Sequence, residues 1–209
     1  MKFRPKALPR VLPKQKFLKK SRPKKNPLTT KKVNNVLNLK IGDKSPEIFN
    51  AVVEIPRGSQ NKYEFDEETG VFKLDRVLYS PTHYPVDYGF IPETRSQDGD
   101  HLDVLIIGGH PLFVGCVLSV KPVGILKMID NGDEDFKILG VQAKNPRLET
   151  ISDIKDIEAS NPHLLKEIAH FFQVYKELEG KKTNIIGWEG VERAKEEIIK
   201  ARDFYRNAG

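Results

Sequence analysis

The clearest hydrophobic pattern in the chain is a period-two alternation over residues 49–55. One face carries the apolar side chains of Phe49, Ala51, Val53 and Ile55, and the other carries Asn50, Val52 and Glu54. Alternation of this kind predicts a strand. Pro56 ends it, because proline cannot donate a hydrogen bond to a neighbouring strand.

Shorter patterns of the same kind predict that the body of the chain is rich in strands. We expect strands at 62–65, 71–74, 76–79, 104–107, 116–123, 124–129 and 138–141. The segment 81–92 is different, because Pro81, Pro85 and Pro92 lie among its aromatic residues. We expect a structured loop there, neither a regular helix nor a central strand.

The last part of the chain changes to helical periodicity. Between 162 and 178 apolar residues recur at spacings of three and four, which predicts a helix opened by Pro162 and ended by Gly180. A second helix is expected at about 189–205. Strands first and helices last favour an α+β fold, in which helices pack on a β-barrel or curled sheet.

Length and composition limit the alternatives. A chain of 209 residues is long enough for one sizeable core plus an appendage. Its single cysteine, Cys116, excludes an intramolecular disulfide and fits a reducing compartment. No apolar run approaches the roughly 20 residues that a membrane helix needs, so we expect a cytoplasmic protein with no membrane partner.

The net charge of +6 is very unevenly distributed. Residues 1–40 contain 14 Lys and Arg and no acidic residue, whereas the rest of the chain has 21 basic against 29 acidic residues, a balance of −8. We therefore expect a polybasic N-terminal extension at 1–40 and a folded domain at 41–209. The extension could be a solvated disordered tail, an arm that binds RNA or another polyanion, or an organelle-targeting segment.

Two acidic segments each precede a predicted buried strand. Asp98, Asp100 and Asp103 come before 104–107, and Asp130 and Asp135 come before 138–141. Carboxylates crowded at the start of a strand repel one another, and a bound divalent cation such as Mg²⁺ commonly stabilises them. The alternative is an acidic turn exposed to solvent. A calcium-binding helix-loop-helix is excluded, since it needs Gly and Glu where this sequence has Asp103 and Gly109.

The neighbouring charges indicate what such a site could bind. With Glu54 and Glu64, seven carboxylates would meet four cations, and those cations are Lys62, Arg76, Lys137 and Lys176. The resulting charge of −3 requires divalent metal, while Lys and Arg among acids indicate a phosphate-bearing substrate. Metal with phosphate-binding cations is typical of phosphoryl transfer, here with water as the nucleophile.

At this point the chain resembles the family I soluble inorganic pyrophosphatases, over about residues 45–207. The acidic loop 98–103 resembles the family signature Asp-x-Asp-Pro-x-Asp. Further segments agree in order and spacing, namely 53–56, 62–64, 75–76, 84–89, 127–130, 135–137 and 170–176. The resemblance implies a five-stranded OB-like β-barrel with C-terminal helices packed on its side, preceded by a disordered or extended basic tail. It also implies Mg-dependent hydrolysis of inorganic pyrophosphate to two phosphates.

The resemblance assigns roles residue by residue. It implies several Mg²⁺ ions per subunit, held by Asp98, Asp100, Asp103, Asp130 and Asp135, with Asp100 also the base or orienter for water. Phosphate contacts correspond to Lys62, Arg76, Lys137, Tyr175 and Lys176, and Lys62, Arg76 and Tyr88 join Asp100 in the catalytic group. Tyr84 and Tyr88 supply hydroxyls at the site, and Glu54, Glu64 and Tyr84 support it.

Two positions depart from the family pattern. His101 stands where the family has proline, and Asn131 stands where many relatives carry an acid. The resemblance also implies a homo-oligomer, a hexamer if bacterial-like or a dimer if eukaryote-like. The alternative function is an RNA- or ribosome-associated protein whose tail binds polyanion and whose pyrophosphatase-like body is a scaffold.

Overall fold

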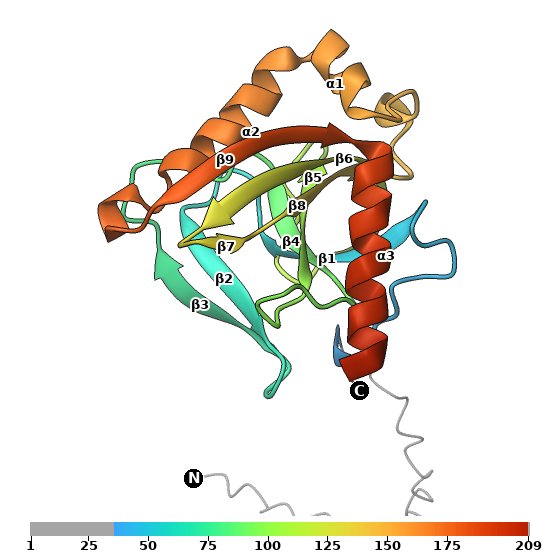
Figure 1. The fold of residues 1–209 in the computed structure, drawn as a ribbon, viewed down its shortest axis with the longest axis horizontal. Helices are drawn as coiled ribbons and strands as arrows, with labels where there is room; N and C mark the ends of the chain where they lie inside the picture. The colour runs from blue at the N-terminus through green and yellow to red at the C-terminus, as the bar shows by residue number, and fades with distance from the viewer. Residues whose placement is uncertain (1–35, 209) are drawn as a thin grey trace, which may run out of the picture. The chain divides into compact units, whose positions relative to one another are not determined.

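Five strands close into a barrel at the centre of the structure, which is a computed structural model describing residues 36–208 (Figure 1). The barrel strands are β1 (Phe49–Ile55), β4 (Asp87–Ile91), β5 (Leu102–Ile107), β8 (Lys137–Gln142) and β6 (Val117–Asp130). Each pairs with the next in that order, and β6 pairs back onto β1. All pairings are antiparallel except β5 with β8. The expected five-stranded OB-like barrel is confirmed.

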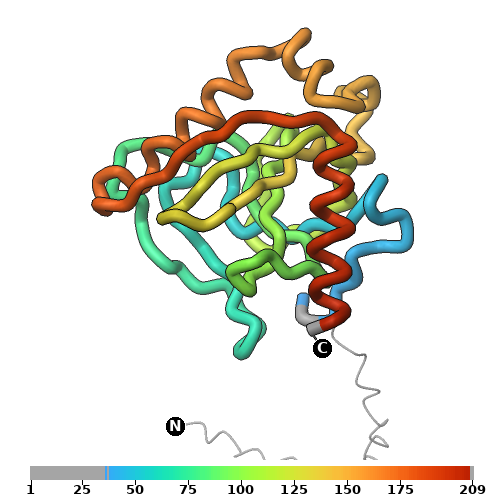
Figure 2. Tube along the Cα trace, in the orientation of Figure 1, coloured from blue at the N-terminus to red at the C-terminus, as the bar shows by residue number. Residues whose placement is uncertain are grey.

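The described chain contains four further strands in addition to the five of the barrel. The long strand β6 also pairs with β9 (Thr183–Gly190) and with the short β7 (Asp133–Glu134). In contrast, β2 (Asn61–Asp66) and β3 (Val71–Val77) form a separate two-stranded sheet. Figure 2 shows this hairpin projecting beside the barrel.

Helices cover the barrel on two sides (Figure 1). They are α1 (Ile154–Ser160), α2 (Pro162–Val174) and α3 (Val191–Ala208), with short 3₁₀ turns η1 (Val36–Asn38), η2 (Pro146–Leu148) and η3 (Glu177–Glu179). Alternate residues of the strands serve two cores. Leu105 packs with α1 and α2, whereas its neighbours Val104 and Ile106 pack with α3. This alternation follows from the strand period of two.

The prediction that 81–92 contains no central strand is wrong. β4 lies between β1 and β5, and all five of its residues are buried. Pro85 and Pro92 flank β4 without interrupting it, so every residue within it keeps its N–H donor. Gly89 lets the backbones approach, because a Cβ there would lie 1.9 Å from the Val52 carbonyl oxygen.

Several predicted boundaries also differ from the structure. Residues 71–77 form one strand instead of two, and 117–130 form one strand that shifts register between Pro122 and Gly124. The first predicted helix ends at Val174, and α3 begins at Val191. Neither α1 nor β9 was predicted, so strands do not all precede helices. β9 is only partly buried and has no clean alternation for the sequence to show.

The expected N-terminal extension falls almost entirely outside the described residues. Its boundary at residue 40 therefore stays a prediction, as does its disordered or extended form. Ile41, at the predicted start of the folded domain, is buried. Among the helices of the described chain, none is both long and apolar enough to cross a bilayer.

Candidate active site

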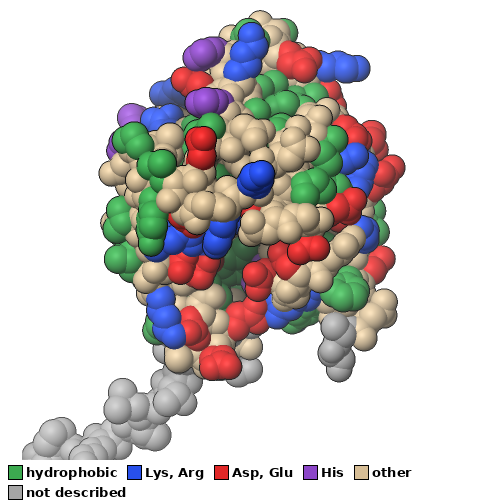
Figure 3. Space-filling model, turned by 60° about the vertical axis from the view of Figure 1, so that its left-hand side comes forward, with side chains coloured by type: hydrophobic (Ala, Val, Ile, Leu, Met, Phe, Trp, Pro, Cys, Tyr) green, Lys and Arg blue, Asp and Glu red, His purple; other side chains and the backbone are tan. Residues whose placement is uncertain are grey.

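One cavity of about 300 Å³ collects twelve of the fourteen residues predicted for the site. They come from the hairpin, the barrel strands, the loops before β5 and β8, and the segment after α2. They are Glu54, Lys62, Glu64, Tyr88, Asp98, Asp100, Asp103, Asp130, Asp135, Lys137, Tyr175 and Lys176. Figure 3 shows acidic and basic side chains gathered around a recess on this face. The fold thus brings together residues that are more than 100 positions apart in the sequence.

The other two predicted residues, Tyr84 and Arg76, do not line the cavity. Tyr84 is buried behind it, where its ring packs 5.5 Å from Tyr88 and 4.7 Å from Phe171. Arg76 donates from Nε to Glu179 at 2.9 Å and also pairs with Asp75. It therefore lies at the edge of the site, held by two carboxylates.

Lys137 is the buried cation at the centre of the site. Its side chain is 2% exposed, and Nζ donates to Asp103 at 2.6 Å and to Asp135 at 2.7 Å. Burial opposes its charge, but the two carboxylates outweigh burial and raise the pKa of Lys137 well above its ordinary value. Nζ also lies over the rings of Tyr88 and Phe172, at 5.6 and 5.3 Å.

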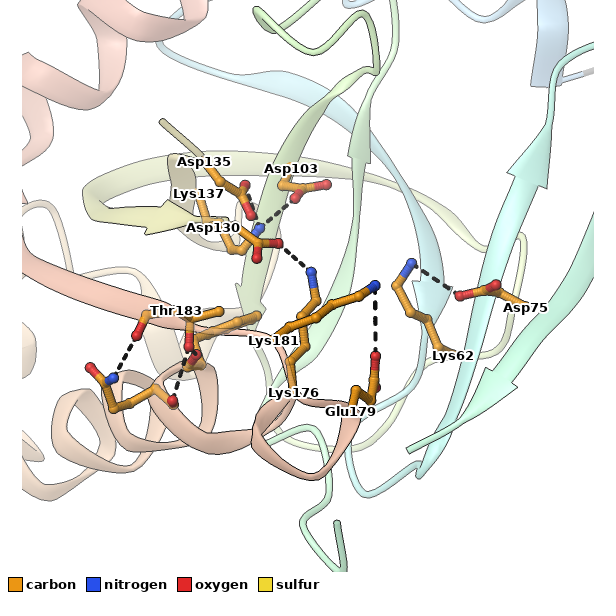
Figure 4. Close-up of polar contacts among 12 residues, drawn as sticks. Lys62, Asp75, Asp103, Asp130, Asp135, Lys137, Lys176, Glu179, Lys181 and Thr183 are labelled. Carbon is orange, nitrogen blue, oxygen red and sulfur yellow. Dashed lines mark hydrogen bonds and ion pairs between the residues drawn. The ribbon is translucent and has the colours of Figure 1, made fainter. Parts of the chain in front are cut away.

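Two other lysines approach the cavity from different elements. Lys176, just after α2, pairs with Asp130 at the end of β6. Lys62 on β2 pairs with Glu64 and lies 3.5 Å from Asp75. Figure 4 shows the ends of Lys62 and Lys176 approaching one region from different elements, and both side chains line the cavity. These two ammonium groups are placed to meet an anion that enters the cavity.

The acidic loop before β5 brings carboxylates close to one another. Asp98 Oδ1 accepts the backbone N–H of Asp100 at 3.0 Å. Burial, followed by the nearby charges of Asp98 and Asp103, raises the pKa of Asp100. Burial also raises the pKa of Glu54 to about 8, although its Oε1 accepts the N–H of Phe65 at 2.8 Å. Around Asp100 and Glu54 the metal-free site therefore disfavours the charged carboxylate form.

The pKa of Tyr88 is also raised, well above its ordinary value, by burial and by the charge of Asp103. Its hydroxyl therefore stays protonated at neutral pH and can act as a hydrogen-bond donor.

The donor set fits hard divalent cations such as Mg²⁺. In the described chain no three His, Cys, Asp or Glu side chains converge as a metal cluster. Asp103 and Asp135 pair instead with Lys137, and Asp130 pairs with Lys176. Yet Asp130 Oδ1 is buried without a hydrogen-bond partner. A buried carboxylate oxygen left unpaired beside other carboxylates is a ligand that magnesium accepts.

The two departures from the family pattern have local explanations. Asn131 and Gly132 both have positive φ, 51° and 105°, in the turn between β6 and β7. Asn-Gly is one of the preferred pairs for such a two-residue hairpin turn, so Asn131 suits the local backbone. His101 stacks on Phe90 and contacts Glu67.

Some residues around the cavity were not predicted. Tyr63, Phe65, Glu67, Phe90, Ser96 and Phe136 also line it. Tyr63 and Phe65 alternate with Lys62 and Glu64 on β2. Strand periodicity predicts that they point to the opposite face, so the sequence did not indicate that all four line one cavity. Glu67 and Ser96 carry no signal in the sequence, because their places depend on how the hairpin and the acidic loop meet.

Known proteins with this arrangement share one description. A model of the family described as inorganic pyrophosphatase matches residues 51–206. The inorganic pyrophosphatase of Geobacillus stearothermophilus is 53% identical over 148 residues, 71% of this chain and 88% of that protein. The Nostoc sp. inorganic pyrophosphatase is 50% identical over 161 residues, 77% of this chain and 94% of that protein.

Solved structures show the same likeness in three dimensions. The crystal structure of inorganic pyrophosphatase from Thermus thermophilus superposes with a TM-score of 0.78 at 44% identity, covering 82% of this chain and 99% of that one. The sequence, the barrel and the charged cavity agree, and the chain belongs to the inorganic pyrophosphatase family.

Proposed function

We propose that this protein is a metal-dependent inorganic diphosphatase that hydrolyses pyrophosphate to two phosphates. The observation that carries the proposal is the single cavity in which Asp98, Asp100 and Asp103 face the cations Lys62 and Lys176. Carboxylates suit divalent metal, and the ammonium groups suit phosphate oxygens. Membership of the family supports the same reaction.

The cations of the chain would bind and neutralise the substrate. Lys62 and Lys176 meet the entering anion, Arg76 supports its outer end, and Tyr175 and protonated Tyr88 offer hydroxyl donors. Lys137 remains charged between two carboxylates and adds positive potential beneath the substrate. Together these groups stabilise the negative charge that gathers on the leaving phosphate as the bridging P–O bond breaks.

Asp100 is the group we assign as general base. Its raised pKa strengthens it as a proton acceptor, and the water from which it removes a proton attacks one phosphorus atom. We assign Asp98, Asp100, Asp103, Asp130 and Asp135 as the ligands of several Mg²⁺ ions, with Glu54, Glu64 and Tyr84 supporting them. When bound, Mg²⁺ supplies Lewis-acid neutralisation of phosphate oxygens and a lower pKa for the attacking water.

Phosphate release from pyrophosphate, with and without Mg²⁺, tests the activity. Asp100→Asn should lower kcat by roughly 10²–10⁴-fold with thermal unfolding nearly unchanged, because the amide cannot accept the proton. Asp133→Asn, an exposed acid outside the cavity, is the matched control and should stay active. Absent Mg²⁺-dependent release by the wild-type protein would overturn the function, and full activity of Asp100→Asn would overturn its role.

Partners and location remain expectations of the sequence. A homo-oligomer, hexameric or dimeric, agrees with the family, and a cytoplasmic location agrees with it too. Nothing in the family or structural matches supports a scaffold that binds RNA or ribosomes in place of an enzyme. The N-terminal extension lies almost entirely outside the described residues, and binding of RNA by it stays one of the predicted alternatives.

A further inference from the structure

The hairpin β2–β3 carries Lys62, Glu64 and Arg76 but is not part of the barrel sheet. Five of the seven residues of β3 are exposed. A two-stranded hairpin is at best marginally stable by itself. Contacts with the rest of the protein must therefore set the distance between its catalytic side chains and the acidic loop.

Contacts hold the hairpin near the turn end of β2 and near the far end of β3. The Phe65 N–H donates to Glu54 on β1 at 2.8 Å, and the Phe65 ring stacks on Phe90 at 5.6 Å. Arg76, near the end of β3, pairs with Glu179. None of these contacts involves a side chain of the turn itself, residues 67–70.

Glu67 makes the contacts at that turn. Its Oε2 accepts from Arg95 Nη2 at 2.6 Å, and its Oε1 lies 3.0 Å from His101 Nε2. Arg95 and His101 flank the acidic loop, in the segment between β4 and β5. One carboxylate thus ties the end of the hairpin to the loop that carries Asp98 and Asp100.

Both partners of Glu67 are themselves fixed. The His101 ring is stacked on Phe90 at 4.8 Å and 9°, with Nδ1 2.9 Å from the Thr94 carbonyl oxygen. The backbone N–H of Arg95 donates to Ala201 on α3 at 2.9 Å, and its guanidinium lies 5.5 Å from the ring centre of Tyr205. The hairpin is therefore held against rigid elements.

We propose that Glu67, Arg95 and His101 are positioning residues that latch the hairpin onto the acidic loop and so set Lys62 and Glu64 opposite Asp100. The inference rests on the proposed function. Strand rise places Glu67 only about 10 Å along the chain from Glu64, so freedom at the turn is transmitted to the site. The latch acts on substrate binding more than on the chemical step, because Lys62 contacts the anion.

Three variants and one control test the latch. Glu67→Ala removes both contacts, and Glu67→Gln keeps a hydrogen-bond acceptor. His101→Phe keeps the stack on Phe90 while losing the polar contacts with Glu67 and with the Thr94 carbonyl oxygen. Glu68→Ala is the matched control, since Glu68 lies in the same turn, carries the same charge and, in the described structure, has no ion pair. Hydrogen exchange of 61–77 in metal-free protein and the kinetics of pyrophosphate hydrolysis are measured.

In Glu67→Ala and His101→Phe the amide hydrogens of residues 61–77 should exchange faster than in the wild-type protein. Both substitutions should raise KM by about three- to fivefold and change kcat less. Glu67→Gln should recover part of the loss, and Glu68→Ala should match the wild-type protein. The double variant Glu67→Ala/His101→Phe should exchange 61–77 no faster than the faster single variant, because Glu67→Ala already removes the contact with His101.

Unchanged exchange and unchanged KM in Glu67→Ala would overturn the latch, as would equal effects in Glu68→Ala. Additive effects of the two substitutions on the exchange of 61–77 would also overturn it. A wild-type protein without pyrophosphatase activity would instead refute the proposed function, and the exchange measurement would still decide whether Glu67 holds the hairpin.

Discussion

At the scale of single residues, lysine side chains in this site offset the charge of neighbouring carboxylates. Lys137 neutralises part of the charge of Asp103 and Asp135, and Lys176 does the same for Asp130. Removing one partner of a buried ion pair leaves the other charge uncompensated, which costs more than the pair contributes when intact. The stability of the metal-free protein should therefore depend on its buried lysine.

Lys137→Met should lower the free energy of unfolding by about 3–5 kcal/mol in EDTA, because two carboxylates lose their buried cation. Excess Mg²⁺ should stabilise this variant more than the wild-type protein, since a divalent cation can take over the neutralisation. Urea denaturation with EDTA and with Mg²⁺ measures both effects. Lys144→Met, at an exposed lysine, is the control, and a loss that Mg²⁺ leaves unchanged would contradict the prediction.

Glu54 should make stability depend on pH. Its pKa is about 8 in the folded protein against 4.5 for the ordinary side chain, so the folded state binds the proton more tightly. Its stabilisation is complete below about pH 4.5 and lost as pH rises toward about 8. Within that window the free energy of unfolding should fall by up to about 1.4 kcal/mol per pH unit.

Glu54→Gln should remove this slope while keeping an acceptor for the Phe65 N–H. Urea denaturation of the metal-free protein between about pH 5 and pH 8 compares the two proteins. The variant should gain stability relative to the wild-type protein as pH rises. Parallel pH profiles would show that Glu54 is not protonated in the fold, and exposed Glu47→Gln should leave the profile unchanged.

At the scale of elements, β4 matters most for building the site. It places Tyr88 under the cavity and lies between β1 and β5, which carry Glu54 and Asp103. Its close contact with β1 depends on Gly89 having no side chain. β4, which the prolines led us not to expect, is therefore a central strand of the barrel beneath the candidate site.

Gly89→Ala should disrupt this pairing. The added Cβ would lie 1.9 Å from the Val52 carbonyl oxygen, a clash that only backbone movement relieves. We expect the free energy of unfolding to fall by about 3 kcal/mol, or the protein to be insoluble. Gly109→Ala is the control because nothing lies within 4 Å of its Cβ. Equal stability of the two variants in urea would contradict the role of Gly89.

At the scale of the whole molecule, the sequence divides into a basic extension and an acidic body. The full chain should therefore bind RNA in a gel shift, with affinity falling on the order of 10³-fold between about 50 and 200 mM salt. A chain starting at Ile41 should not bind but should release phosphate at the same rate. Replacing the lysine pairs at 19–20, 24–25 and 31–32 by Gln is the control, and no difference between the chains would contradict the prediction.

The sequence alone determined much of this protein. The alternation over 49–55 fixed β1 at its observed bounds, and the acidic loop, the second acidic turn and Lys62 were found from residue type and spacing. Those signals are local: period two marks a half-buried strand, and crowded carboxylates mark a charge that must be neutralised. They indicated an α+β fold and a metal site, and the resemblance of the motif segments to a known family supplied the barrel type and the family.

Tertiary structure decided what local patterns cannot carry. β4 exists because partners on both sides satisfy its backbone, and β9 because β6 offers it an edge, neither of which depends on periodicity. Pairing across the fold also decided that Lys137 lies between two carboxylates and that Glu67 reaches Arg95 and His101. Distances between segments far apart in the chain are set by packing, so only the folded protein fixes them.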